Sequence, residues 1–216
     1  MDRKPVSVKS YANIAIVKYW GKADAERMIP STSSISLTLE NMYTETKLSF
    51  LPEDATGDVM YIDDELQGEK ETTKASKVLD LFRTNPNQHV KIETWNNMPT
   101  AAGLSSSSSG LSALVKAANE LFQVGKTQSE LAQIAKFASG SSSRSFFGPL
   151  AAWDKDSGEV YPVETDLKLA MIMLVLTDQK KPVSSRDGMK LCTETSTSFP
   201  EWIKQSEQDY KDMLDY

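Results

Sequence analysis

The most informative segment of the chain is Pro99-Thr100-Ala101-Ala102-Gly103-Leu104-Ser105-Ser106-Ser107-Ser108-Ser109-Gly110, a glycine turn followed by a run of hydroxyls. The residues after it are apolar at helical spacing, which predicts a helix that begins in the serine run: Leu111, Leu114, Val115, Ala118, Leu121 and Phe122. The first turn of a helix exposes unpaired N–H groups at the positive end of its dipole, so it can hold a phosphate. The stretch is not a Walker A loop, because no Lys-Ser or Lys-Thr follows the glycines. A helix cap rich in serine is the alternative interpretation.

Composition narrows the classes of function. The 216 residues carry a formal net charge of −6, which argues against a nucleic-acid-binding surface but allows a local cluster of cations. The longest apolar run, 169–176, is too short to cross a membrane and predicts a buried strand. The single cysteine, Cys192, fits a reducing cytoplasm. His89, the single histidine, is predicted on a surface strand, and its isolation argues against a zinc site or a Ser-His-Asp triad.

Strands dominate the first hundred residues and helices follow, without regular alternation, which favours an α+β fold. The strand patterns lie at 6–10 and 12–17, read as a pair broken near Tyr11, and at 34–39, 44–50, 59–62 and 90–95. A hairpin is predicted over 150–153 and 159–163, and helices over 72–83, 127–139, 184–193 and 200–214. A change of composition at 165–168 divides the chain into domains 1–165 and 166–216.

Three further clusters combine cations with small or hydroxyl residues. Lys18-Tyr19-Trp20-Gly21-Lys22 follows a predicted strand and indicates an anion pocket with aromatic walls, or else a solvated strand end. Ser139-Gly140-Ser141-Ser142-Ser143-Arg144-Ser145 ends in a guanidinium that can bind phosphate or carboxylate with two parallel hydrogen bonds. Its alternative is a plain helix end with Gly140 as the C′ residue. Ser184-Ser185-Arg186-Asp187-Gly188-Met189 fits a helix N-cap at least as well.

The order of these motifs resembles that of the diphosphomevalonate decarboxylase family of the GHMP kinase superfamily. The motifs are, in chain order, Ala12-Asn13-Ile14-Ala15-Ile16-Val17, Lys18–Lys22, Pro99–Leu104, and Ser139-Gly140-Ser141 with Arg144. The resemblance runs from about Val6 to Met189. It implies an N-terminal domain like ribosomal protein S5 domain 2 and the start of a ferredoxin-like C-terminal domain. It also implies use of ATP and Mg²⁺ to phosphorylate the tertiary hydroxyl of 5-diphosphomevalonate, after which phosphate and carbon dioxide leave and isopentenyl diphosphate remains.

The resemblance also implies roles for particular residues. Lys18, Ser141 and Arg144 are expected to be catalytic. Substrate binding is expected at the other members of the cation clusters and at one helix lysine: Tyr19, Trp20, Gly21, Lys22, Lys74, Ser139, Gly140, Ser142, Ser143, Ser185 and Arg186. The ATP phosphates are expected at Gly103, Leu104, Ser105, Ser106, Ser107 and Ser108. Lys74 is the weakest assignment, because nothing in its local sequence distinguishes it from an exposed helix lysine.

One departure from the family pattern affects activity. The family carries an essential aspartate, the proposed base for the tertiary hydroxyl, in a glycine-containing segment beyond the point where this sequence stops at Tyr216. We therefore expect the 216-residue chain to be impaired in catalysis. A GHMP-type kinase acting on mevalonate or phosphomevalonate, and a non-catalytic phospholigand-binding module, are the competing interpretations. Family analogy further predicts a homodimer, while the cysteine content, the net charge and the short apolar runs predict a cytoplasmic protein with no nucleic acid or membrane partner.

Overall fold

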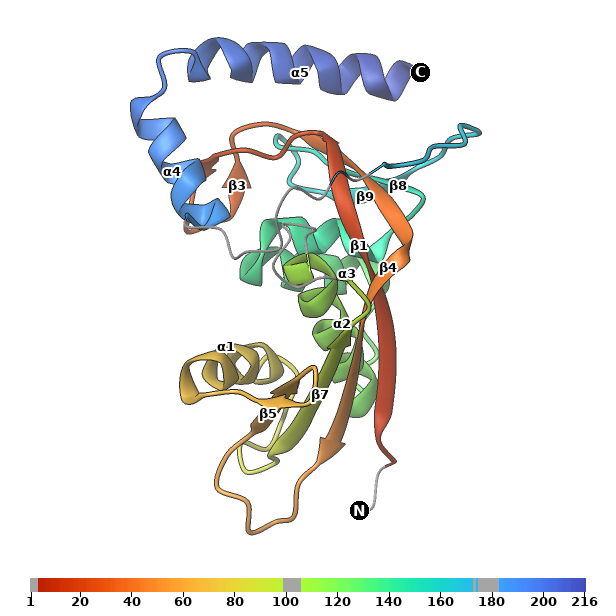
Figure 1. Ribbon diagram of the computed structural model, residues 1–216, viewed down its shortest axis with the longest axis vertical. Coiled ribbons are helices and arrows are strands. Elements are labelled where there is room, and N and C mark those ends of the chain that lie inside the picture. The colour runs from red at the N-terminus through yellow and green to blue at the C-terminus, as the bar shows by residue number, and fades with distance from the viewer. Residues whose placement is uncertain (1–3, 99–105, 173, 175–182) are drawn as a thin grey trace.

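The computed structural model describes residues 4–98, 106–172, 174 and 183–216. Its main feature is a seven-stranded sheet whose long central strand is β4 (Ser34–Phe50), shown in Figure 1. β1 (Val6–Val17) pairs antiparallel along one edge of β4. The other edge of β4 pairs with β7 (Val90–Asn96) at one end and with β8 (Leu150–Trp153) at the other. The sheet is completed by β5 (Val59–Ile62), which is parallel to β7, and by β6 (Glu65–Leu66) and β9 (Val160–Val163).

Two of the predicted strand boundaries are wrong, and for one reason. The patterns at 6–10 and 12–17 belong to the single strand β1, and those at 34–39 and 44–50 belong to β4. The pairing of β1 with β4 shifts register between Tyr11 and Asn13. A bulge of this kind interrupts the alternation of side chains without reversing the chain, so the sequence pattern resembles a break.

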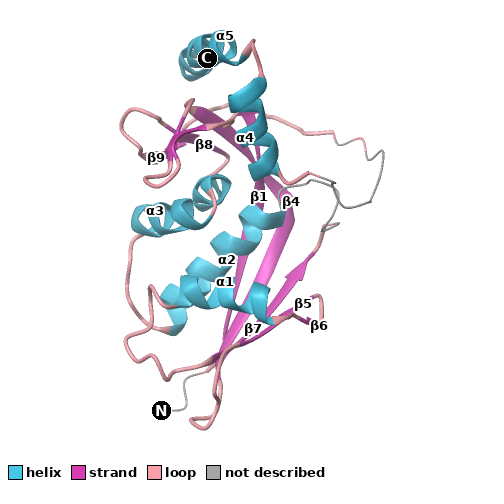
Figure 2. Cartoon of the chain, turned by 90° about the vertical axis from the view of Figure 1, so that its left-hand side faces the viewer, coloured by secondary structure: helices cyan, strands magenta, loops and turns pink. Residues whose placement is uncertain are grey.

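Helices cover one face of this sheet, as Figure 2 shows: α1 (Glu69–Leu79), α2 (Ser106–Leu121) and α3 (Gln128–Ala138). α2 begins in the serine run as predicted and packs on β1 and β4. The predicted capping box of α3 is present, with Thr127 and Glu130 each accepting from the other's backbone N–H. A 3₁₀ helix, η1 (Gly140–Phe146), follows α3, and the predicted hairpin forms from β8 and β9.

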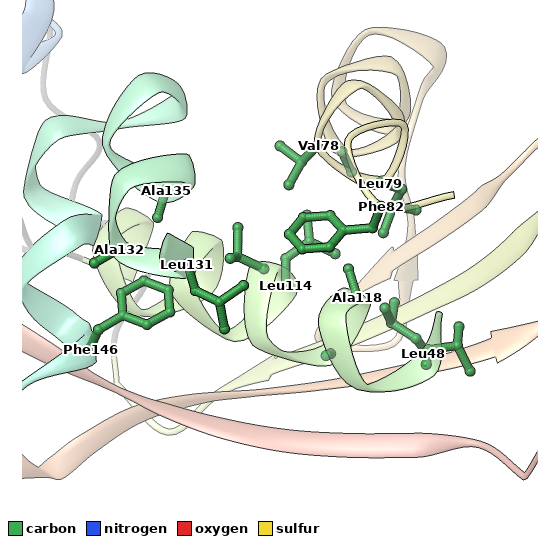
Figure 3. Packing of buried hydrophobic residues seen from close by; sticks show 14 of the residues in the cluster. Leu48, Val78, Leu79, Phe82, Leu114, Ala118, Leu131, Ala132, Ala135 and Phe146 are labelled. Atoms are coloured by element: carbon green, nitrogen blue, oxygen red, sulfur yellow. The ribbon is translucent and has the colours of Figure 1, made fainter. Parts of the chain in front are cut away.

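The main core lies between these helices and the sheet (Figure 3). Leu114 and Ala118 of α2 pack among Leu79 of α1, Leu131 of α3 and Leu48 of β4. A second cluster lies where α5 (Phe199–Asp215) crosses the upper end of the sheet, above α4 (Ser185–Thr195) in Figure 1. The α+β prediction is thus confirmed, and the long strands place the residues that follow β1 beside η1.

Two predictions differ from the structure. In the run 169–176, residues Leu169, Met171, Ile172 and Leu174 are exposed, and none of the described strands pairs with them, so the predicted buried strand is wrong at those positions. An apolar run becomes a buried strand only where partner strands and a covering layer exist. His89 precedes β7 and is half-buried beside Asp58, 3.8 Å from its carboxylate, so it is not a surface strand residue.

Candidate anion-binding site

Arg144 of η1 is the most unusual charge in the described part of the chain. Its side chain is buried, with the residue only 2% exposed. Nε donates to Ser36 Oγ at 2.6 Å and a terminal nitrogen donates to Ser34 Oγ at 2.8 Å. No carboxylate among the described residues forms an ion pair with it. Burial lowers the pKa of Arg144 to about 10, with Tyr19 opposing the shift. A buried cation that is held only by neutral hydroxyls is arranged to receive an anion.

Two aromatic rings flank this guanidinium. Tyr19 and Trp153 lie 5.9 and 5.8 Å from it and contact each other with ring centroids 5.0 Å apart. Gly140 makes this packing possible, because a Cβ at that position would lie 2.9 Å from the ring of Trp153 and 3.1 Å from that of Tyr19. Gly140 follows the C-cap Ser139 of α3 and so stands at the C′ position, but its φ is not positive and it begins η1, so it is not the left-handed glycine that usually ends a helix.

The serines of η1 differ in their surroundings. The hydroxyls of Ser139 and Ser141 lie 3.3 Å apart and both residues are half-buried. Ser143 Oγ donates to the carbonyl of Gly140 at 2.8 Å, so it stabilises the turn itself. Ser142 Oγ is buried, and no hydrogen-bond partner for it is found within the described residues. These contacts bring the Ser139–Arg144 cluster and Tyr19 together.

The segment that follows β1 is the second part of this region. Lys18 is exposed, and its carbonyl accepts from Thr32 Oγ1 at 3.0 Å. Gly21 has φ +88°, a conformation that favours glycine, and a Cβ there would lie 2.8 Å from the ring of Phe199 at the start of α5. Lys22 lies in the small hairpin of β2 (Lys22–Asp24) and β3 (Ile29–Pro30), with Nζ 3.2 Å from Met28 Sδ. Trp20 is half-buried between them.

The serine run supplies the start of α2, a helix of 16 residues without an acidic side chain in its first turn. Ser107 is exposed, whereas Ser108 is fully buried. Gly103, Leu104 and Ser105 lie outside the described residues, and of Ser106 only the backbone, at the first position of α2, is described. Of the first turn, only Ser107 is described as exposed, and a helix start of this kind is the type that can bind phosphate.

Two further lysines, half-buried Lys116 and buried Lys136, share the lack of an acidic partner within the described ranges. Lys116 of α2 donates to Ser10 Oγ at 3.0 Å and to the carbonyl of Ser145 at 3.1 Å, and burial lowers its pKa to about 8. Lys136 of α3 donates to the carbonyl of Gly158 at 3.1 Å, and burial lowers its pKa as well. Together with Arg144 they make the interior around η1 electropositive.

Lys74, Ser185 and Arg186, like Lys18, are not joined to this cluster by any described hydrogen bond or ion pair. Lys74 is exposed on α1 and pairs with Glu71 of the same helix at 2.8 Å. Ser184 caps α4, accepting from the backbone N–H of Asp187 at 3.1 Å, which confirms the N-cap interpretation of that cluster. Ser185 is exposed at the first position of α4, and the side chain of Arg186 lies outside the described residues. Their expected substrate contacts stay predictions.

Sequence reasoning missed the residues that hold Arg144. Ser34 and Ser36 stand two apart in β4, so both face η1, and Trp153 comes from β8. The alternation Ser-Ile-Ser-Leu at the start of this strand was the available signal, because a buried hydroxyl needs a polar partner.

Comparisons with solved structures define the class of this fold. The structure of mevalonate pyrophosphate decarboxylase from Streptococcus pyogenes matches 100% of this chain, and 68% of its own, at 66% identity and a TM-score of 0.94. A structure described as MDDEF in complex with MVAPP, AMPPCP and magnesium matches 96% of this chain, and 67% of its own, at 36% identity and a TM-score of 0.79. The sheet and its layer of helices are those of the GHMP kinase-like class.

Sequence comparison narrows the class to a family. The model of the diphosphomevalonate decarboxylase-like N-terminal domain matches residues 10–161. The curated diphosphomevalonate decarboxylase of Saccharomyces cerevisiae is 36% identical over 92% of this chain. The chain belongs to the diphosphomevalonate decarboxylase family, whose named members are enzymes. It spans 56% of the length of that yeast relative. Within the described residues, no helix is both long and apolar enough to pass through a lipid bilayer.

Proposed function

We propose that the protein takes part in the ATP-dependent decarboxylation of (R)-5-diphosphomevalonate to isopentenyl diphosphate, with ADP, phosphate and carbon dioxide as the other products. Family membership supports the reaction class, and the MDDEF complex with MVAPP, the ATP analogue AMPPCP and magnesium supports the ligands. In this reaction two polyanions must be held side by side, so most of the catalytic effect comes from positioning and charge neutralisation.

The buried guanidinium of Arg144 is the observation that carries the proposal. Its planar fork suits a carboxylate or a diphosphate, and the hydroxyls of Ser34 and Ser36 orient it without neutralising it. The rings of Tyr19 and Trp153, which contact each other, pack against one side of it and limit its side-chain motion. In the proposed site Arg144 binds and orients the acidic end of the substrate.

The remaining cluster residues complete the proposed substrate site. Ser139, Gly140, Ser141, Ser142 and Ser143 supply hydroxyl and backbone groups around Arg144, and the segment Lys18–Lys22 supplies cations. Lys18 and Ser141 are proposed beside the reacting hydroxyl and carboxylate. Lys74, Ser185 and Arg186 are proposed as outer contacts to the diphosphate. Departure of phosphate from a tertiary carbon builds positive charge there, and electrons from the breaking C–C bond of the adjacent carboxylate neutralise it.

The ATP phosphates are proposed to bind at the start of α2. Ser107 is exposed in its first turn, which contains no acidic side chain to repel them. The preceding residues Gly103, Leu104 and Ser105, with Ser106 and Ser108, complete the proposed loop. No group of three acidic, histidine or cysteine side chains suited to a metal ion occurs in the described ranges. Mg²⁺ is therefore proposed to bind mainly through the phosphates, as is usual for this ion.

The larger organisation is also a proposal. Residues 1–165 are proposed as the nucleotide- and substrate-binding domain and residues 166–216 as the beginning of a C-terminal domain. The protein is proposed to act as a homodimer in the cytoplasm.

Calorimetry and product analysis test the function. We expect the 216-residue chain to bind 5-diphosphomevalonate, and to bind mevalonate at least tenfold more weakly because mevalonate lacks the diphosphate. In the intact protein, labelled 5-diphosphomevalonate with ATP should release labelled carbon dioxide. ADP production without carbon dioxide would instead indicate a kinase, and binding without ADP production would indicate a non-catalytic module. Absence of binding to either ligand would refute all three.

A further inference from the structure

Lys116 lies in the middle of α2, on the side that faces the sheet and η1. Its ammonium donates to Ser10 Oγ of β1 at 3.0 Å and to the carbonyl of Ser145 of η1 at 3.1 Å. The ring of Phe146, also in η1, lies 4.8 Å from the same nitrogen. One side chain thus joins α2, the sheet and the 3₁₀ helix that carries Arg144.

The charge on Lys116 sets the direction of a chain of hydrogen bonds toward the serine run. An ammonium only donates, so Ser10 Oγ must accept from it. Ser10 can then donate to Ser112 Oγ, which lies 2.8 Å away, and Ser112 in turn donates to the carbonyl of Ser108 at 2.8 Å. Hydrogen bonds aligned in one direction reinforce one another. This chain ends on the first turn of α2.

A second set of contacts leads from Lys116 to the Arg144 segment. The carbonyl of Ser145 accepts from Lys116, and its hydroxyl accepts from Asn13 Nδ2 at 2.8 Å. The same amide nitrogen donates to the carbonyl of Ser141 at 3.0 Å. Both sides of Arg144 in η1 are therefore held to β1, and Lys116 connects that arrangement to α2.

We propose that Lys116 is a positioning residue whose ammonium sets the placement of the Arg144 segment relative to the serine-rich start of α2. The inference rests on the function proposed above, because it assigns the two segments to the two anions. Lys116 is half-buried, and no acidic side chain among the described residues pairs with it, so no ion pair offsets the desolvation of its ammonium. Its lowered pKa is consistent with that cost. Its hydrogen bonds instead determine where two separate segments lie.

The test uses Lys116→Met in the intact protein, with Lys77→Met on the exposed side of α1 as the matched control. Calorimetry gives the affinity for 5-diphosphomevalonate, and hydrogen exchange gives the protection of the amides in residues 140–146. We expect Lys116→Met to weaken binding about tenfold and to speed exchange in η1 at least fivefold, with both unchanged in the control. In an Arg144→Lys background the same substitution should weaken binding less than threefold, because the two residues act through one placement.

Each possible result of these measurements either supports or refutes the positioning role of Lys116. Unchanged affinity in a folded Lys116→Met protein, or full additivity with Arg144→Lys, would overturn the proposal. If Lys116→Met does not fold, Ser10→Ala removes the hydroxyl that accepts from Lys116 and contacts Ser112, and it should weaken binding about threefold and speed exchange in η1; no change in either overturns the proposal. If the unsubstituted protein does not bind 5-diphosphomevalonate, the proposed function fails. Exchange in η1 then still decides whether Lys116 holds that helix in place, since faster exchange supports the positioning role and unchanged exchange refutes it.

Discussion

Arg144→Met separates the stability of this site from its binding function. The pKa of Arg144 falls from the ordinary value of 12.5 to about 10 because the guanidinium is buried. That difference corresponds to about 3 kcal/mol against the charged form in the folded chain. Methionine removes this penalty and leaves two serine hydroxyls without their donor, at roughly 1 kcal/mol each. We therefore expect the free energy of unfolding to be unchanged or to rise by about 1 kcal/mol.

The effect on binding has the opposite sign. A carboxylate or diphosphate held by the planar fork accepts two charge-assisted hydrogen bonds, each contributing about 1.5 kcal/mol or more. Their loss should weaken the binding of 5-diphosphomevalonate by about a hundredfold or more. Urea unfolding followed by circular dichroism and calorimetric titration measure the two quantities. Arg27→Met, at an arginine whose side chain is 79% exposed, is the control and should change neither.

The reasoning is refuted if Arg144→Met lowers the free energy of unfolding by more than about 2 kcal/mol, since the arginine would then be a structural element. It is equally refuted if the substituted protein binds 5-diphosphomevalonate as the unsubstituted one does, because no anion would then be held by the guanidinium.

Three further predictions concern the surroundings of the site and the core. Gly140→Ala should lower the free energy of unfolding by about 1–3 kcal/mol, because the new Cβ would lie 2.9 Å from the ring of Trp153. The control Gly57→Ala places its Cβ in open space and should change the free energy of unfolding little. Equal losses for the two variants in thermal unfolding would contradict this prediction. Asp58→Asn should lower the free energy of unfolding by about 3–5 kcal/mol, because the Asp58 carboxylate pairs with the buried side chain of Arg83 at 2.6 Å. A loss below about 1 kcal/mol in urea unfolding would show that this ion pair is dispensable. The pKa of Lys116 is about 8 in the folded chain and 10.5 in the unfolded chain, so the unfolded chain binds more protons between these pH values. The free energy of unfolding should therefore rise with pH in this range, relative to that of Lys116→Met. A stability difference that stays flat from pH 8 to 10 would exclude this shift.

Local signals in the sequence predicted much of the helical layer. The capping box at Thr127 and the apolar spacing after the serine run place α2 and α3 correctly, because helix ends depend on residues a few positions apart. The strands were harder. β1 and β4 are each continuous through a bulge, and only the pairing between them shows that the interruption near Tyr11 is not a turn.

The candidate site shows the same division between local and long-range information. Arg144 and the neighbouring serines were proposed as site residues from the segment 139–145, and Tyr19 was proposed from the segment 18–22. Ser34 and Ser36 were not, because they are more than a hundred residues from Arg144 and become its partners only through the pairing of β4 with β8 and the position of η1. Lys116 was hidden for a related reason, since a lysine in a helix pattern is ordinarily exposed.

Comparison of two buried arginines supports the interpretation of the site. Arg83 and Arg144 are both removed from solvent, but Arg83 pairs with Asp58 at 2.6 Å, and that carboxylate also accepts from Ser76 and from the backbone of Val90. The guanidinium of Arg83 is therefore paired with a carboxylate of the chain itself, as expected for a charge that stabilises the fold. At Arg144 the chain supplies two serines instead, which orient the guanidinium and leave its charge available. A site that must accept an anion benefits from this difference, because a resident carboxylate would compete with the ligand.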